Sequence, residues 1–387
     1  MTERGGATRL LFLINDARFF VTHILPLARA AVAAGYDTHV ALPFQGTALD
    51  MADELAAIRG CGAQLHDLPI RRGAKMWLGE LSALVAIGRL ALRLRPDILH
   101  CITIKPVLYG GLAARLLRLR KVIFFITGLG HVFIAQGAQA HVLRRLVMLA
   151  YRLILHCRGA ITIFENEDYR GLFIGANLVK RDQTVLIPGC GVDSAVFYPA
   201  STAPPEPLIV LLPARLQQEK GVREFVAAAR ILHARGVKVR MVLAGYADFD
   251  RPGGIGEAEL RGWCDSGAVE WWGHTTIMPE ILRQAHIVCL PSYREGFSKT
   301  LIEAAATGLP VVTCDVPGCR DAARAGETAI LIPPRDASAL ADALEQLLRD
   351  PALRASMGIR GRDLAVKEFP VTRFVAANLE VYARPPL

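Results

Sequence analysis

Residues 291–318, PSYREGFSKTLIEAAATGLPVVTCDVPG, decide the fold that we expect for this chain. The apolar run IVCLP leads into them, a polar turn carries Glu295, and a short helix with Glu303 stops at Gly308 and Pro310 before the run PVVTCD. Strand, loop, helix and strand within about thirty residues make one βαβ unit. A helix start presents free backbone N–H groups that favour an anion. Two acids around such a helix start predict a binding site for a sugar, a diphosphate and a ribose.

A purely structural interpretation of the same stretch stays open. Thr300 and Glu303 have the spacing of a capping box, in which Glu303 returns a hydrogen bond to the helix start. Glu295 is, in that interpretation, an ordinary loop acid exposed to solvent. Both interpretations can hold for Glu303, because a cap positions the backbone while the carboxylate faces the ribose.

The rest of the chain repeats this alternation of strands and helices. In the first half we expect strands at 9–15, 37–43, 63–70, 97–103, 121–127, 160–166 and 184–193, a loop at 16–20, and helices at 23–34, 51–62, 79–95, 107–119 and 138–157. The pattern starts again at LIVLLPARL (208–216), after the linker PASTAPPEP (199–207), which is rich in Pro, Ser and Thr. The alternation predicts an α/β fold of two doubly wound domains, residues 1–198 and 208–370.

Length, hydropathy and cysteine use exclude several classes of protein. The 387 residues are 52% apolar, but no apolar run approaches the ~18 residues that span a membrane. The start, MTERGGATRLLFLIND, leads into a first strand and does not have the pattern of a signal peptide. The eight cysteines show no C-x-x-C spacing. They predict reduced thiols of a cytoplasmic protein, with neither disulfides nor zinc.

The net charge of +9 lies entirely in the first half. Residues 1–200 hold 23 Lys/Arg and 14 Asp/Glu, whereas residues 201–387 hold 22 of each. A basic half suits an anionic partner, either a membrane surface or a diphosphate. Nucleic acid is excluded, because no nucleic-acid motif appears. The helix at 138–157 carries Arg144, Arg145 and Arg152 among apolar residues. It lies either on a membrane with its cations at the headgroups or in the core with its arginines reaching out to solvent.

Several polar residues follow predicted strands and are candidates for a ligand site. Arg215 and Lys220, in PARLQQEKG, are placed to hold a diphosphate, although they could equally be solvated charges at a helix start. In the first half, loops or strand ends carry His23, His100 and His131, and a Gly-rich turn, ITGLGH, carries Thr127 and Gly128. A lone histidine is more often structural than functional.

No sequence pattern predicts a metal or a cofactor. Asp248 and Asp250 have the D-x-D spelling of a metal-diphosphate site, but they fall in a polar loop away from Glu295. Gly253, Gly254 and Gly256 lack the strand that a dinucleotide fingerprint requires immediately before it. No His/Cys/Asp cluster has metal-ligand spacing.

Taken together, these motifs resemble the family-4 retaining glycosyltransferases of the GT-B fold, in which two Rossmann-like domains face each other across a cleft. The resemblance rests on PARLQQEKG, EGFSKTLIE, GLPVVTCDVPGCRD and IPGCGVDSAVFYP. Three segments of the first half, FFVTHILPLARA, HCITIKPVLYGGLAARL and ITGLGHVF, resemble the branch that acts on polyprenyl-linked saccharides for O-antigen, capsule or N-glycan precursors. Several members of that branch transfer N-acetylgalactosamine from its UDP form.

The resemblance implies a role for each matching residue. It makes Arg215 and Lys220 ligands of the donor diphosphate, Glu295 a partner of the sugar hydroxyls and Glu303 a partner of the ribose, and it places His131 in the loop facing the donor sugar. The implied donor-binding residues are Gly296, Phe297, Ser298, Lys299, Thr300, Leu301, Glu303 and His274. The implied acceptor-side residues are Asp16, His23, Thr127 and Gly128. Residues 371–387 are implied to cross back to the first domain. The chain departs from the family at Asn15–Phe20, where a Gly-rich loop is usual, and at His131, where the branch often has an aromatic residue.

We therefore expect a retaining, metal-independent glycosyltransferase. It would move an N-acetylhexosamine, with N-acetylgalactosamine as first choice, from a UDP-sugar to a polyprenyl-diphosphate saccharide at the inner face of the plasma membrane. Transfer of another hexose, or a UDP-N-acetylglucosamine 2-epimerase on the same fold, is the alternative. A non-catalytic binding subunit is the remaining class, and it would usually have lost the acids that this chain keeps.

Overall fold

The structure is a computed structural model, and it describes residues 7–44, 51–69, 77–128, 138–202, 204–247, 249, 253–275 and 277–385. The chain divides into two compact units. Unit 1 comprises Met1–Cys190 and Phe374–Leu387, and unit 2 comprises Gly191–Arg373.

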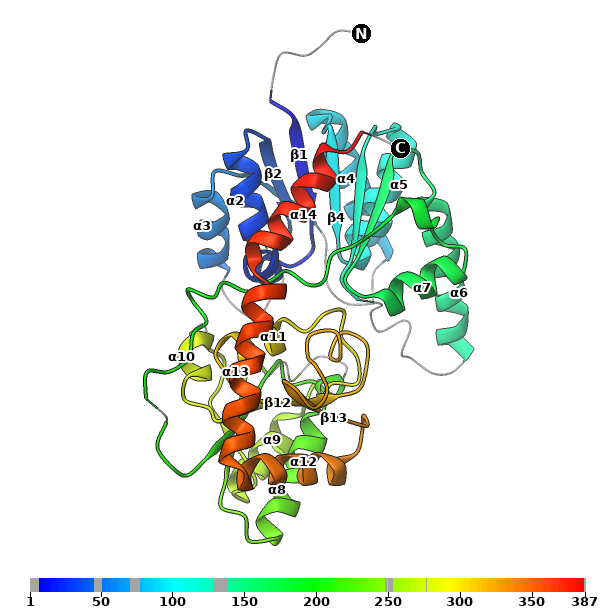
Figure 1. The fold of residues 1–387 in the computed structure, drawn as a ribbon. Coiled ribbons are helices and arrows are strands. Elements are labelled where there is room, and N and C mark those ends of the chain that lie inside the picture. The colour runs from blue at the N-terminus through cyan, green and yellow to red at the C-terminus, as the bar shows by residue number, and fades with distance from the viewer. Residues whose placement is uncertain are drawn as a thin grey trace. The chain divides into compact units, whose positions relative to one another are not determined.

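Unit 1 is built on a parallel sheet of seven strands in the order β3-β2-β1-β4-β5-β6-β7 (Figure 1). The strands are β1 (Arg9–Leu13), β2 (Asp37–Leu42), β3 (Gln64–Asp67), β4 (Ile98–Ile102), β5 (Val122–Ile126), β6 (Ala160–Phe164) and β7 (Thr184–Leu186). The helices are α1 (Ala17–Phe19), α2 (Leu25–Ala33), α3 (Ala52–Gly60), α4 (Trp77–Leu94), α5 (Ile104–Leu117), α6 (Ala138–Leu155), α7 (Glu167–Gly175) and most of α14 (Val371–Ala383). Every residue of β4, β5 and β6 is buried, because helices cover both faces of a parallel sheet.

The two faces of this sheet carry different helices. Successive side chains of a strand point to opposite faces. In β1, Leu11 and Leu13 therefore join a core with residues of α4, α5, α6 and α7, whereas Leu10 and Phe12 join a second core with residues of α2, α3 and α14.

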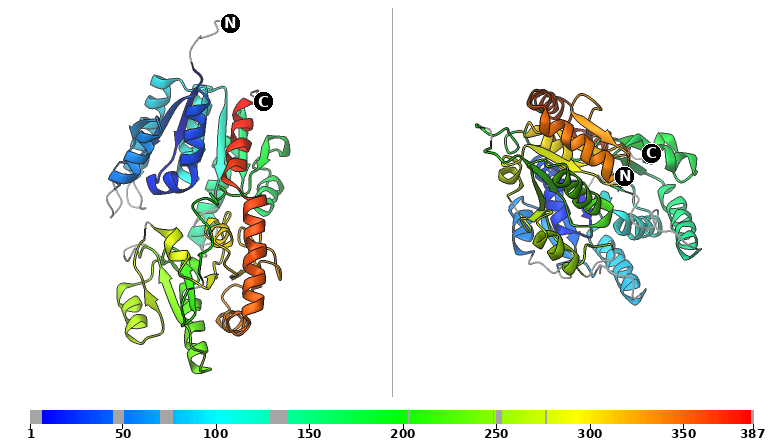
Figure 2. Two further views of the ribbon diagram at one scale, coloured as in Figure 1. Left: turned by 60° about the vertical axis from the view of Figure 1, so that its left-hand side comes forward. Right: turned by 90° about the horizontal axis from the view of Figure 1, so that it is seen from below.

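Unit 2 is built on a parallel sheet of six strands in the order β10-β9-β8-β11-β12-β13. The strands are β8 (Ile209–Pro213), β9 (Arg240–Ala244), β10 (Glu270–Trp271), β11 (Ile287–Leu290), β12 (Val311–Cys314) and β13 (Ala329–Ile332). The helices are α8 (Val222–Ala234), α9 (Glu257–Asp265), α10 (Met278–Leu282), α11 (Lys299–Ala306), α12 (Ala337–Arg349) and α13 (Pro351–Glu368). The long helix α13 runs along one side of the unit (Figure 2). It packs against α11, while α12 packs against α8. The predicted α/β class with two Rossmann-like sheets is confirmed.

Both sheets reverse their strand order at an equivalent point. The first strand of each unit has the second strand on one side and the fourth on the other, so the order reverses between β1 and β4 in unit 1 and between β8 and β11 in unit 2. In open parallel sheets, ligands bind outside the carboxyl ends of the strands at such a switch point. The loops that follow β1, β4, β8 and β11 are therefore the expected ligand-binding loops.

The last helix completes the core of unit 1. His100 of β4 is fully buried, and its Nδ1 lies 2.7 Å from the Tyr382 hydroxyl. The Lys121 ammonium donates to the carbonyl of Tyr382 at 2.7 Å and to that of Arg384. A lysine at the end of a helix satisfies carbonyls that have no partner within the helix. These bonds fix α14 across the sheet, on the side of α2 (Figure 1).

The structure corrects the prediction at the start of unit 1. Residues 16–20 are not a loop, because α1 begins at Ala17 and continues through a π-helical turn, Phe20–Ile24, into α2. The Asp16 carboxylate accepts a hydrogen bond from the Phe19 N–H at 3.1 Å, so Asp16 is the N-cap that starts the helix early. Helix α7 was not predicted, and it starts at a similar cap from Asn166. No helix in the described parts of the chain combines the length and the hydropathy that a bilayer crossing requires.

Candidate active site

The switch point of unit 2 brings Lys220 and Glu295 together. Strands β8 and β11 are hydrogen-bonded neighbours, so the loops that follow them meet at one sheet edge. The Lys220 ammonium donates to Glu295 Oε1 at 2.5 Å, and the Ser292 hydroxyl donates to the same oxygen at 2.7 Å. Gly221 has φ +71, and a Cβ there would lie 2.1 Å from the Pro291 carbonyl oxygen. Only glycine therefore lets the two loops approach closely enough for this ion pair.

Tyr293 holds the Glu295 loop from one side. Its N–H donates to the Glu219 carbonyl at 2.9 Å, and its hydroxyl donates to Glu224 Oε1 at 2.6 Å. The Arg335 guanidinium lies over its ring, 4.6 Å from the centroid. Burial, together with the bond to Glu224, raises the pKa of Tyr293, so its hydroxyl remains a donor. The loop is thus tied to α8 and to the segment after β13.

Gly318 holds the same loop from the other side. Its N–H donates to Asp321 at 2.7 Å, and its carbonyl accepts from the Ser298 N–H at 2.9 Å. With φ +79, it leaves no room for a Cβ, which would lie 2.6 Å from the Glu295 carbonyl oxygen. Cys319 is fully buried beside it, and burial, with a smaller effect of the Glu295 charge, raises the pKa of its thiol. A neutral buried thiol is not a nucleophile at physiological pH.

Helix α11 starts at this loop, and Glu303 lies on its first turns. Ser298 is the N-cap, but its side chain makes no capping hydrogen bond. Glu303 is 8% exposed, and its carboxylate pairs with the Lys299 ammonium, which also lies 5.4 Å from the centre of the Phe197 ring. The capping box that Thr300 and Glu303 could form is therefore wrong, because the helix starts one residue before Thr300 and the carboxylate turns to a lysine.

Arg215 and His274 follow two other strands of the same sheet. Arg215 comes two residues after β8, its side chain is exposed, and within the described residues it has no ion-pair partner. His274 follows the edge strand β10 and is exposed, with its ring centroid 6.2 Å from that of Tyr246. In parallel strands all of these positions fall on the carboxyl-end edge. Two cations and a paired acid at one edge can bind a diphosphate and a polar group next to it.

Some of the predicted donor-binding residues point their side chains into the core. Leu301 is fully buried, and Phe297 packs edge-on against Phe369 with ring centroids 5.1 Å apart. Gly296 and Ser298 are also buried. These residues can face a ligand only with their backbone groups, whereas Lys299 and Thr300 keep partly exposed side chains.

In unit 1 the structure assigns structural contacts to two predicted acceptor-side residues. Asp16 caps α1, as described above, and the His23 ring stacks on Phe19 at 4.0 Å between centroids. The Thr22 hydroxyl lies 2.7 Å from His23 Nδ1. Thr127 and Gly128 directly follow β5, on the edge that also carries the β1 loop. His131, Asp248 and Asp250 lie outside the described residues.

Thr103 is a residue of the unit 1 switch point that sequence reasoning missed. It follows β4 with φ +72, which is unusual for a β-branched residue, and its hydroxyl donates to Asn15 Oδ1 at 2.8 Å. This bond joins the ends of β1 and β4. No local signal identifies it, since the spacing of Asn15 and Thr103 along the chain acquires meaning only once the two strands are known to be neighbours.

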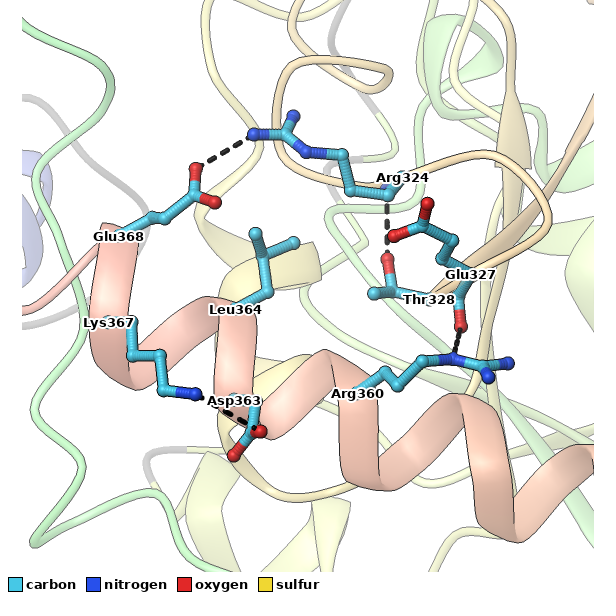
Figure 3. Close-up of a pocket in the computed structure, with 8 residues that line it drawn as sticks. All are labelled: Arg324, Glu327, Thr328, Arg360, Asp363, Leu364, Lys367 and Glu368. Atoms are coloured by element: carbon cyan, nitrogen blue, oxygen red, sulfur yellow. Dashed lines mark hydrogen bonds and ion pairs between the residues drawn. The ribbon is translucent and has the colours of Figure 1, made fainter.

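A pocket of about 250 Å³ lies between α13 and the segment that leads into β13 (Figure 3). Its lining consists of Arg324, Glu327, Thr328, Arg360, Asp363, Leu364, Lys367 and Glu368. Four of the charged side chains form ion pairs: Arg324 pairs with Glu368 at 2.7 Å, and Lys367 pairs with Asp363 at 3.3 Å. The Arg360 guanidinium donates to the Glu327 carbonyl at 2.8 Å. None of the sequence-predicted residues lines this pocket. Among the described residues, moreover, no group of His, Cys, Asp or Glu is arranged to hold a metal ion.

Two family models match the chain, one in each unit. The model described as "Glycosyl transferase 4-like" matches residues 9–156, and the model described as "Glycosyl transferases group 1" matches residues 207–350. The second match contains the whole Lys220–Glu295 arrangement.

Two curated relatives cover most of the chain. One is the N,N'-diacetylbacillosaminyl-diphospho-undecaprenol alpha-1,3-N-acetylgalactosaminyltransferase of Campylobacter jejuni, which is 28% identical over 70% of this chain and 73% of its own length. The other is the putative glycosyltransferase EpsD of Bacillus subtilis, which is 27% identical over 97% of this chain and 96% of its own length.

Solved structures agree in fold. The sucrose-phosphate synthase of Thermosynechococcus elongatus superposes with a TM-score of 0.79 at 21% identity, covering 97% of this chain and 98% of its own. Anabaena HepE, in complex with UDP and glucose, superposes with a TM-score of 0.76 at 16% identity, covering 97% and 99%. With both units matched by family models and the two-sheet architecture shared with these structures, the chain belongs to the group 1, or family 4, glycosyltransferases and is an enzyme of the GT-B fold.

Proposed function

We propose that this glycosyltransferase moves an N-acetylhexosamine, N-acetylgalactosamine as first choice, from a UDP-sugar to a polyprenyl-diphosphate saccharide, with retention of anomeric configuration and without a metal. The observation that carries the proposal is the Lys220–Glu295 pair at the switch point of unit 2. It puts a cation and a hydrogen-bond acceptor at the place where parallel sheets bind nucleotides.

The cations would stabilise the departing group. When the bond between the sugar C1 and the diphosphate oxygen breaks, negative charge develops on the diphosphate. Lys220, held by Glu295, and Arg215 would supply cations at that edge, and Ser298, the N-cap of α11, makes no side-chain capping bond. The attacking acceptor hydroxyl forms its bond to C1 on the face that UDP leaves, and its proton passes to the departing phosphate oxygen.

Glu295 and Glu303 would bind the two ends of the donor. One carboxylate oxygen of Glu295 is bonded by Lys220 and Ser292, which fixes the carboxylate, and Glu295 would accept hydrogen bonds from the sugar hydroxyls. Glu303 would accept from the ribose hydroxyls, with its carboxylate held by Lys299. The remaining implied contacts are the backbone groups of residues 296–301 and the base-side position of His274. In unit 1, Asp16, His23, Thr127, Gly128 and His131 remain predictions for the acceptor side.

The acceptor class is supported by the relatives. The Campylobacter jejuni relative is named for transfer to a diphospho-undecaprenol saccharide, and a Staphylococcus aureus relative, CapM, 23% identical over 79% of this chain, is named for capsular polysaccharide biosynthesis. We propose the same setting here: a cytoplasmic enzyme of polysaccharide synthesis that works against an anionic membrane surface through its basic first half.

A donor screen tests the proposal. The purified protein is incubated with a polyprenyl-diphosphate acceptor and, in turn, each common UDP-sugar, and products are weighed by mass spectrometry. Transfer from UDP-N-acetylgalactosamine, abolished in Lys220→Ala and unaffected by EDTA, is the expected result. A product whose new linkage is inverted, or transfer that EDTA stops, would contradict the mechanism.

An epimerase is the second candidate, because it would use the same donor cations. It would act on UDP-N-acetylglucosamine without any acceptor. Incubating the protein with the UDP-sugar alone therefore separates the two functions: a 2-epimerised product supports the epimerase, and unchanged donor supports the transferase.

A further inference from the structure

Helix α6 of unit 1 has two apolar faces, and only one of them is packed. Tyr151, Ile154 and Leu155 are at most 5% exposed and belong to the core beneath the sheet. On the outside, Val142, Leu146, Leu149 and Leu153 are 59%, 59%, 55% and 53% exposed. Their spacing puts them on one helix face. Isolated exposed leucines are ordinary, but a continuous apolar stripe marks an interaction site.

Two arginines border the same stripe. Arg145 and Arg152 are exposed, and the helical repeat places both along one flank of the apolar residues. An apolar face bordered by arginines, with no acid on the helix, is typical of a helix that lies in the interface of a lipid bilayer. The apolar side chains reach the acyl boundary, and the arginines reach the headgroups.

The neighbouring helices extend this surface. Leu116, at the end of α5, is 70% exposed, and on α4 Leu81 and Leu92 are each 58% exposed. The Arg115 guanidinium donates to the Leu153 carbonyl at 2.9 Å and ties α5 to α6. Helix α4 packs along α5, so the three helices present one connected surface, which we call the α4–α6 face.

The charge of α5 and α6 has one sign, and Glu80 of α4 is paired with Lys105 of α5 at 2.6 Å. Residues 98–164, which contain α5 and α6, hold nine Lys/Arg and no Asp/Glu. These 67 residues therefore carry a net charge of +9, which equals the net charge of the whole chain. We infer that the α4–α6 face docks on an anionic lipid bilayer, with α6 lying along the headgroups. The inference deepens the membrane part of the proposed function, since it names the surface.

A second copy of the chain suits this face less well. A twofold contact through α6 would bring Arg145 and Arg152 of one copy against the same basic face of the other, with no acid to pair them. Anionic phospholipid headgroups supply the missing negative charge without that repulsion.

Vesicle co-sedimentation of the full chain tests the inference, with neither donor nor acceptor present. Failure of this binding is therefore distinguishable from failure of the sugar transfer. The expected result is binding to vesicles of phosphatidylcholine with about 30% phosphatidylglycerol, weak binding to pure phosphatidylcholine, and loss of most binding in about 0.5 M NaCl. In Arg145→Gln/Arg152→Gln, the partition coefficient should fall about 25-fold, at roughly fivefold for each cation.

The matched control is Arg29→Gln/Arg59→Gln. Both residues are exposed, on α2 and α3, and they lie on the opposite face of the unit 1 sheet. This control variant changes the net charge as much as Arg145→Gln/Arg152→Gln does. Its vesicle binding should stay within twofold of that of the unsubstituted protein. Leu146→Gln/Leu149→Gln should weaken binding at every salt concentration, with an unchanged far-UV spectrum.

Three results would overturn the inference. The first is equal binding to neutral and anionic vesicles. The second is an equal loss in the two arginine pairs, because binding would then follow net charge alone. The third is a dimer in sedimentation velocity that Leu146→Gln/Leu149→Gln dissociates while vesicles bind nothing, since a second copy would then be the occupant.

Discussion

Removing either partner of the Lys220–Glu295 pair should destabilise unit 2. Removing both should lower the free energy of unfolding by less than the sum of the two single losses. The two side chains are 17% and 14% exposed, and their polar atoms lie 2.5 Å apart. Breaking a fully buried pair by removing one partner costs about 3–5 kcal/mol, while exposed pairs contribute about 0–1 kcal/mol. This pair lies between those limits, so Lys220→Met and Glu295→Gln should each lower the free energy of unfolding by about 2 kcal/mol.

The double variant separates stability from catalysis. Lys220→Met/Glu295→Gln leaves no unpaired charge, so its cost should fall short of the sum of the single costs by about 2 kcal/mol. Turnover should not recover, because the cation that neutralises the leaving diphosphate is still absent. We expect kcat of Lys220→Met to fall by about 10²–10³, and that of the double variant to be at least as low.

Urea unfolding followed by circular dichroism gives the stabilities, and product formation from a UDP-sugar gives kcat. Lys238→Met is the control, since Lys238 is an exposed lysine of the same unit. It should change neither quantity. The reasoning is refuted if the single costs add to within about 0.5 kcal/mol, or if activity returns in the double variant together with stability.

Three further outcomes can be checked. Burial lowers the pKa of His100 to about 3 from 6.5, so the unfolded chain takes up a proton below pH 6.5 that the folded chain does not. The free energy of unfolding should therefore fall by about 1.4 kcal/mol between pH 7.5 and 5.5. In His100→Gln this contribution to the shift of the urea midpoint with pH should vanish. An unchanged pH dependence in that variant would argue against the buried neutral histidine. Gly326→Ala should lower the free energy of unfolding by about 1–2 kcal/mol, because φ is +73 and the added Cβ meets no other atom. Gly318→Ala should lower it clearly more and also lower kcat, because the added Cβ would meet the Glu295 carbonyl. Equal losses of stability in the two variants would contradict the geometry. Glu303→Gln should raise KM for the UDP-sugar about tenfold with little change in kcat, as lost ground-state binding requires, and a selective loss of kcat would count against a ribose role.

The sequence predicted most of the strands because buried parallel strands are continuous apolar runs, as in Val122–Ile126 and Ile287–Leu290. It also predicted Lys220 and Glu295 as site residues, from their positions after strands. What it could not supply is their contact. The two residues are 75 positions apart, and they meet only because β8 pairs with β11, a fact of strand order that no local pattern encodes.

The wrong predictions have a common physical cause. Asp16 was assigned to a loop, and Thr300 with Glu303 to a capping box, because polar residues near a helix start are compatible with several hydrogen bonds. In the structure Asp16 does cap a helix, and Glu303 does not. Which hydrogen bond forms depends on competing partners, as when the Lys299 ammonium pairs with the Glu303 carboxylate in place of the helix start. The roles of these residues toward donor and acceptor, and the exact domain limits at 198 and 208, remain predictions.

The contribution of α14 to unit 1 has a consequence for synthesis on the ribosome. Unit 2 is continuous from Gly191 to Arg373 and can fold as soon as it has emerged. Unit 1 is translated first but finishes second, because Phe374, Val381 and Tyr382 belong to its core. Until they arrive, the apolar surface around His100 on one sheet face has no cover. The nascent protein thus carries an incomplete first domain through the translation of the second, and that interval is when chaperones would have the most to bind.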